Sequence, residues 1–146
     1  MPASFAQRMV AYVIDGFIVS IPGYVLWFLW WTAMMGASAA GASDDVATVL
    51  FGGGILVFYP LSFVITFLYF GYFWSKNGQT PGKKVMNIRV ERPDGSLQTF
   101  VRGGLRGTFG YWISAIILFL GFIWAAFDAN QEAWHDKLFE TRVVRA

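Results

Sequence analysis

Residues 46–75 decide the fold: the stretch VATVLFGGGILVFYPLSFVITFLYFGYFWS contains no charged side chain. A helix that crosses a membrane needs about 20 mainly apolar residues, and this stretch is longer. A helix of a soluble protein usually carries a polar stripe along one face, and no such stripe is visible here. The stretch therefore predicts a helix that lies in a lipid bilayer.

Two further stretches share this character. Between Arg8 and Asp44 the one charged residue is Asp15, and residues 107–127 carry no charge. Charged residues make up 14% of the 146 residues, against roughly 25% in soluble domains. The sequence predicts an all-α membrane protein, a single domain over 1–146 that is a bundle of three membrane segments. Their expected bounds are about 5–35, 46–74 and 107–127.

The first segment has one alternative interpretation, a cleavable signal peptide ending at the small residues 37–39. The apolar part of a signal peptide is typically about 7–15 residues long, so an uncleaved span is favoured. Ser4 and Gln7 have the spacing of a capping box, which predicts that the helix starts near Phe5. The glycines at 52–54 are interpreted as a weak first turn of the second helix rather than as a close helix contact.

Residues 76–106 form a basic loop with seven basic and two acidic residues, a net charge of +5. An excess of Lys and Arg in a short loop marks the cytoplasmic side, which also places the N-terminus there. Residues 86–91 alternate between apolar and polar, as in a strand. A turn at 93–95 and a second strand at 97–101 are expected to complete a small β-like loop, and four glycines between 103 and 110 to loosen the start of the third segment.

The third segment has two interpretations that the sequence leaves open. A straight span places the polar tail, residues 128–146, outside the cell, whereas a re-entrant hairpin returns it to the cytoplasm. The tail has a net charge of −1, which does not decide between them. Residues 141–144 resemble a strand whose natural partner is the strand at 85–90, and that pairing requires both on one side.

Arg8 and Asp15 lie two helical turns apart on one face, roughly 10 Å along the axis, too far for a direct ion pair. A carboxylate inside a membrane helix is costly and needs a partner. Asp15 is therefore either a proton or cation site or a structural bond between helices. The loop at 77–84 lacks the spacing of a phosphate-binding loop, and Lys83 and Lys84 are assigned to anionic lipid headgroups.

The polar residues of the tail give no sign of catalysis or of a metal site. The chain has no cysteine and a single histidine, His135, so neither a metal site nor a cofactor is predicted, and no nucleophile motif appears. His135 and Asp136 are interpreted as a polar pair at the membrane surface. We expect no enzyme, and the net charge of +2 gives no indication of nucleic-acid binding.

The chain resembles the RDD family of bacterial membrane proteins. The resemblance rests on Arg8 and Asp15 in the first helix, on residues 78–90 of the loop, and on His135-Asp136 in the tail. The family is named for an arginine and two aspartates, which match Arg8, Asp15 and Asp136, with Asp128 as the alternative. Departures are the residues at 129–132 and Glu140, where relatives often carry basic residues and glycine.

The resemblance implies a multi-pass protein of the cell membrane with a role in transport, and for some members in sodium/proton exchange. We therefore expect transport of an ion or small solute, with the alternative of a scaffold or accessory subunit that binds lipid or a partner protein. Three segments make a poor conduit, so self-association or a membrane partner is expected as well.

Overall fold

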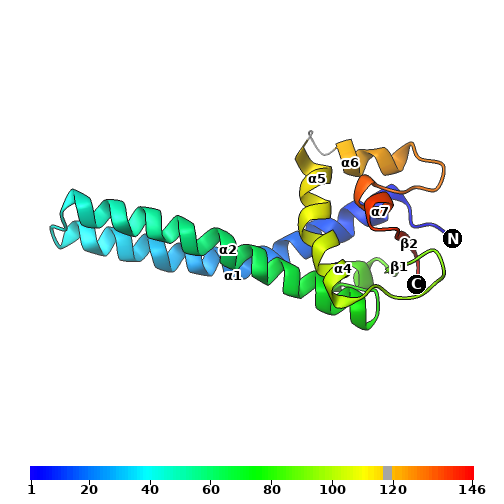
Figure 1. Ribbon diagram of the computed structural model, residues 1–146, viewed down its shortest axis with the longest axis horizontal. Coiled ribbons are helices and arrows are strands. Elements are labelled where there is room, and N and C mark those ends of the chain that lie inside the picture. The colour runs from blue at the N-terminus through cyan, green and yellow to red at the C-terminus, as the bar shows by residue number, and fades with distance from the viewer. Residues whose placement is uncertain (117–119) are drawn as a thin grey trace. The chain divides into compact units, whose positions relative to one another are not determined.

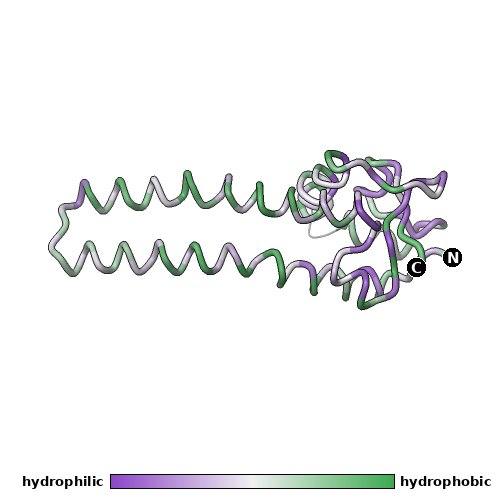
Figure 2. The backbone as a smooth tube through the Cα atoms, turned by 90° about the horizontal axis from the view of Figure 1, so that it is seen from below, coloured by the Kyte–Doolittle hydropathy of each residue, from purple (hydrophilic) through white to green (hydrophobic). Residues whose placement is uncertain are grey.

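The chain forms two compact units in the computed structural model, which describes residues 1–116 and 120–146. The terminal unit comprises Met1–Ile18 and Thr66–Ala146, and the hairpin unit comprises Val19–Ile65. In Figure 2 the hydrophilic residues are concentrated in the terminal unit, whereas the helices of the hairpin unit are hydrophobic along most of their length.

The structure is mostly helical, and two of its helices are long and apolar enough to cross a membrane, as predicted (Figure 1). They are α1 (Phe5–Ala39) and α2 (Asp44–Lys76). The capping box is present, because Ser4 and Gln7 exchange backbone-to-side-chain hydrogen bonds of 3.1 and 3.3 Å. The bounds of both helices lie within a few residues of the expected ones.

The glycines at 52–54 do not form a weak first turn, because they lie within α2. In the hairpin unit a Cβ atom on Gly54 would overlap the indole ring of Trp30. The indole N–H of Trp30 donates a hydrogen bond of 3.0 Å to the Leu50 carbonyl. Glycine is required here because it admits a tryptophan ring to the helix backbone, so this site is a close helix contact.

The rest of the terminal unit is built from short elements. They are α3 (Pro81–Val85), β1 (Ile88–Glu91), α4 (Phe100–Leu105), the π-helical turn η1 (Arg106–Gly110), α5 (Tyr111–Ile116), α6 (Leu120–Ile123), the 3₁₀ turn η2 (Trp124–Ala126), α7 (Trp134–Leu138) and β2 (Arg142–Arg145). The strand predicted at 97–101 is wrong. Thr99 instead caps α4, since its hydroxyl accepts the backbone N–H of Arg102 and so favours a helix start.

The two strands come from the basic loop and from the tail. β1 pairs antiparallel with β2, with Val90 opposite Val143, which is the pairing that the sequence offered if the loop and the tail share one side. The N-terminus joins this sheet, because the Ala3 N–H donates to the Val143 carbonyl at 2.9 Å and Pro2 forms a bridge with Val144. Both chain ends and the loop therefore meet within the terminal unit, as Figure 1 shows.

The segment predicted at 107–127 begins earlier than expected, at α4, and its residues 117–119 lie outside the described part of the chain. The helical stretches before and after these residues make an angle of 102°. Its glycines do not loosen the chain. A Cβ on Gly107 would overlap the ring of Phe70, and one on Gly104 would meet Phe67, so the glycines let these helices approach α2 closely.

Candidate functional site

Asp15 is fully buried in the terminal unit and accepts three hydrogen bonds. Its donors are the Thr80 hydroxyl at 2.5 Å, the Gly82 backbone N–H at 2.8 Å and the Tyr69 hydroxyl at 2.9 Å. No lysine or arginine within residues 1–116 and 120–146 forms an ion pair with it. The carboxylate is thus held by neutral donors, an arrangement that satisfies a buried charge through hydrogen bonds alone.

The loop at 78–84 is shaped to receive this carboxylate. Thr80 is the N-cap of α3 and Pro81 is its first residue, so the cap hydroxyl and the N–H of Gly82 face the same side. A Cβ on Gly82 would overlap the Ala11 carbonyl and crowd the Asp15 carboxylate. The loop at 78–84, which superficially resembles a phosphate-binding motif, therefore binds the Asp15 carboxylate of the same chain.

Asp136 lies at the centre of a second buried cluster, and it is the aspartate that contacts Arg8. Arg8 Nη1 donates to Asp136 Oδ2 at 2.9 Å, and the same guanidinium bonds the carbonyls of Ala3 and Val143. Arg106 forms an ion pair with Asp136 Oδ1, and its Nε donates to the Thr141 hydroxyl at 3.0 Å. Two of the three residues matched to the family name, Arg8 and Asp136, are thus in direct contact, and Arg106 is an additional member of the cluster that the sequence did not reveal.

The ionisation of Asp136 follows from these contacts. Burial opposes its charged form, but the neighbouring Arg106, together with His135 and Arg8, outweighs burial and holds the pKa of this carboxyl below its ordinary value. Its Oδ2 also accepts the Ala133 N–H at the start of α7. Asp128 instead pairs with Lys137 in the tail and caps its own loop through the N–H groups of Asn130 and Glu132.

His135 is buried beside this cluster and is uncharged at neutral pH. Burial lowers the pKa of His135 to about 3, although Asp136 favours the charged form. Its Nδ1 shares a hydrogen bond of 2.9 Å with the Ser114 hydroxyl, and its Nε2 lies 3.8 Å from Asp136. The series Ser114, His135 and Asp136 resembles the catalytic triad of a serine hydrolase. Ser114 is fully buried, however, so no substrate carbonyl can approach its oxygen.

Lys83 is buried as well, with 3% of its surface exposed. Its ammonium lies 5.4 Å from the centre of the Trp74 ring and 3.4 Å from the Tyr111 hydroxyl. The assignment of Lys83 to lipid headgroups is therefore wrong, because a side chain that points into the protein cannot meet a lipid surface. Lys84 is exposed and keeps that assignment as an expectation.

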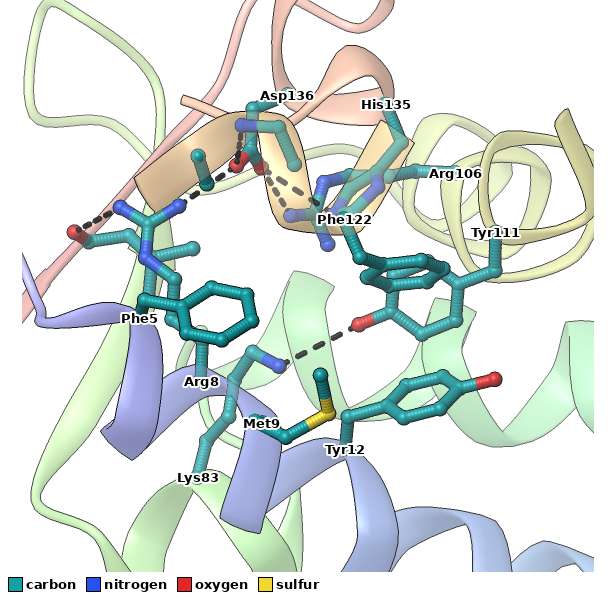
Figure 3. A pocket seen from close by; sticks show the side chains of 13 residues that line it. Phe5, Arg8, Met9, Tyr12, Lys83, Arg106, Tyr111, Phe122, His135 and Asp136 are labelled. Carbon is teal, nitrogen blue, oxygen red and sulfur yellow. Dashed lines mark hydrogen bonds and ion pairs between the residues drawn. The ribbon is translucent and has the colours of Figure 1, made fainter. Parts of the chain in front are cut away.

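A small cavity of about 30 Å³ lies between these side chains. Figure 3 shows Arg8, Lys83 and Arg106 around it, on three different elements, with Asp136 between the two arginines. The rest of the wall is largely aromatic and includes Tyr12, Tyr111 and Phe122. Within the described residues no group of three histidine, cysteine or carboxylate side chains is placed to hold a metal ion.

Two features of the cluster carried signals that sequence reasoning did not use. Arg106 is the last charge before the uncharged residues 107–127, and a cation at such a boundary needs a partner as much as Asp15 does. Thr80 and Gly82 stand in the loop motif that supported the family resemblance, yet their role as donors to Asp15 depends on a contact across 65 and 67 residues.

Comparisons with known proteins identify the family of this chain. The sequence model of the RDD family matches residues 2–140. The chain is 35% identical over 148 aligned residues to the uncharacterized protein YxaI of Bacillus subtilis (strain 168), covering 98% of this chain and 97% of that protein. No solved structure matches the chain. The apolar helices α1 and α2 and the match to the family model indicate a membrane protein. The chain belongs to the RDD family.

Proposed function

We propose that this protein is a multi-pass protein of the cell membrane that takes part in the transport of an ion or small solute. The observation that carries the proposal is the cavity lined by Arg8, Lys83, Arg106 and Asp136. Buried ionisable side chains that gather around a cavity are candidates for a functional site, because burial and neighbouring charges perturb their pKa values. We place the ion-handling residues in this cluster and not at Asp15.

The hydrogen bonds of the terminal unit support one topology. Residues 2–3, β1 and β2 are joined in one sheet, so they share one side of the membrane. The positive charge of the basic loop favours the cytoplasmic side. In this topology residues 19–39 and 44–65 cross the bilayer, since each stretch at 1.5 Å per residue covers about 30 Å. The third segment then enters and returns on the cytoplasmic side.

A scaffold or accessory subunit is the second candidate, and the surroundings of Asp15 favour it. A carrier carboxylate must exchange its ion with water at some stage, whereas Asp15 has no exposed surface and three firm donors. In this candidate the aspartates fix the helices to the loop and tail, and the exposed surface binds lipid or a partner protein. Self-association or a membrane partner belongs to either candidate, because two crossings and a re-entrant segment enclose little space.

Flux measurements in proteoliposomes separate the two candidates. The purified protein is reconstituted, and uptake of protons, sodium and chloride is measured per folded molecule. We expect flux of at least one ion, and a loss of that flux in Lys83→Met. The matched control is Lys76→Met, because Lys76 also contacts a tyrosine hydroxyl, at 2.8 Å, but is exposed. If the unmodified protein carries none of these ions, the transport role is refuted and the scaffold or accessory role is favoured.

A further inference from the structure

The cavity of the terminal unit has an excess of positive charge. Three cations line it, Arg8, Lys83 and Arg106, against the single carboxylate of Asp136. The carboxylate of Asp15 does not line the cavity and accepts hydrogen bonds from Tyr69, Thr80 and Gly82, but its charge also acts on Lys83, so two carboxylates stand near the three cations. His135 adds no charge at neutral pH. A buried charge without a counter-ion is costly, so the cavity as described is electrostatically incomplete.

Two of the cations, Arg106 and Lys83, also have N–H donors that lack a good acceptor. Arg106 is fully buried, and its Nη1 has no hydrogen-bond acceptor within the described residues, although Nη2 and Nε of the same group are bonded. An ammonium has three N–H donors, and the one hydrogen bond recorded for the Lys83 ammonium in this part of the chain is the long contact to Tyr111. Buried donors of this kind indicate a missing partner.

The cost of this arrangement is visible at Lys83. Burial, with the nearby Arg106 acting in the same direction, lowers the pKa of Lys83 to about 8. The two cations lie near the same ring, since the Arg106 guanidinium carbon is 4.4 Å from the centre of Trp74. A negative charge between them would offset their repulsion and accept the free N–H groups.

We propose that the cavity binds one small monovalent anion, a halide such as chloride, held by the Lys83 ammonium, the free N–H of Arg106 and the Tyr111 hydroxyl. The volume of about 30 Å³ exceeds the ~10–15 Å³ that one water molecule needs, yet it is too small for an organic anion. Figure 3 shows Lys83 and Tyr111 reaching toward each other on one side of this space and Arg106 on another.

This inference deepens the proposed function by naming the class of ion. Transport of the halide rests on the proposed function, whereas binding of the halide does not. Binding itself is tested at equilibrium. Unfolding temperatures of the purified, detergent-solubilised full chain are measured in sodium chloride and in sodium gluconate at equal ionic strength. We expect a higher unfolding temperature in chloride, saturating with concentration, and bromide located in the cavity by its anomalous scattering in crystals.

Variants assign the effect to the site. Lys83→Met should weaken chloride binding roughly tenfold or more, because a hydrogen bond to a charged group is lost. In gluconate this variant should be at least as stable as the unmodified protein, since it removes a buried charge, whereas a purely structural lysine would lower stability in both salts. Tyr111→Phe should show a smaller loss of affinity. Lys76→Met, the exposed control, should keep the full chloride effect.

The proposal is overturned if the unfolding temperature is the same in both salts, which would leave water as the occupant. It is equally overturned if the chloride effect survives in Lys83→Met, or if bromide lies only outside the cavity. The bromide position decides the matter even if a variant fails to fold. Halide binding without flux of any ion would refute the transport role but support the halide site. Flux without halide binding would support the transport role but refute the halide site.

Discussion

Arg106 and Asp136 form an ion pair that is closed to solvent, with 1% and 0% of their side chains exposed. Arg8 reaches the other oxygen of the same carboxylate from the first turn of α1. One aspartate therefore holds together the first helix, the start of the third segment and the tail.

Breaking this pair should be strongly destabilising. Asp136→Asn leaves two buried arginines without their counter-ion, and we expect a loss of about 3–5 kcal/mol in the free energy of unfolding. A double-mutant cycle with Arg106→Gln, read from unfolding in detergent, should show strong coupling between the two positions. The pair of Asp128 with the solvent-exposed Lys137 is the control and should show little coupling. Additive effects at Arg106 and Asp136 would contradict the pairing.

Asp15→Asn should lower stability without changing any transport per folded molecule. An asparagine side chain places an N–H₂ group where Asp15 now accepts hydrogen bonds, so at least one donor among Thr80, Gly82 and Tyr69 loses its acceptor. We expect a cost of about 1–3 kcal/mol. Asp45→Asn, at an exposed position, is the control. Loss of flux in a fully folded Asp15→Asn protein would restore Asp15 as the carrier.

Stability should fall as the pH is lowered below about 6.5. Between its ordinary pKa of 6.5 and its folded pKa of about 3, His135 binds a proton in the unfolded chain but not in the folded one, so acid favours unfolding. Asp136, with its lowered pKa, adds to this loss at still lower pH. We expect a loss of a few kcal/mol between pH 7 and pH 4, measured by thermal unfolding.

His135 also offers a direct spectroscopic check, because it is the chain's single histidine. Its ring should give one set of NMR signals that does not move between pH 8 and pH 5. A titration with a midpoint near 6.5 would mean that the ring is hydrated, in conflict with its buried position.

Gly82→Ala should destabilise the fold, since the new methyl group would overlap the Ala11 carbonyl and displace Asp15 from its donors. We expect a cost of about 1–3 kcal/mol for such overpacking. Gly36→Ala, in α1 with open space around its Cβ position, should be neutral or stabilising by up to about 1 kcal/mol through helix propensity. Equal effects of the two changes on the unfolding temperature would contradict the close contact.

The proposed topology predicts where single cysteines can be labelled. The natural chain has none, so each introduced cysteine is unique. Ser96→Cys in the basic loop and Ala146→Cys at the end of the tail should both resist an impermeant reagent in intact cells and react after permeabilisation. Ala42→Cys between α1 and α2 should react in intact cells. Labelling of the loop and the tail from opposite sides would contradict the shared sheet.

The apolar helices were predictable because their signal is local: an uncharged stretch of sufficient length is visible without knowledge of any contact. Alternation indicated the loop strand and a strand in the tail, but their pairing stayed open because it depended on which side the tail lies. The fate of residues 97–101 was not, because Thr99 can cap a helix or continue a strand, and packing against α2 decides between them.

The candidate site was predicted in part, and the errors have one cause. Arg8, Asp15 and Asp136 stood out because isolated charges beside apolar stretches need partners. Lys83 was assigned to the surface because it has a second lysine beside it, and the one-residue step between them turns Lys83 inward and Lys84 outward. Which side chains of a short helix point inward depends on contacts with residues far away in the sequence. The residues next to the helix do not reveal those contacts.

The sheet that joins the two chain ends also sets an order of events during synthesis. Arg8 leaves the ribosome well before its partner Asp136 and the carbonyl of Val143, which follow it by 128 and 135 residues. The same sheet holds Ala146, whose N–H donates to the Asn87 carbonyl at 2.9 Å. The start of the first helix must therefore wait, with its arginine uncompensated, until the tail has been made and has folded back against it.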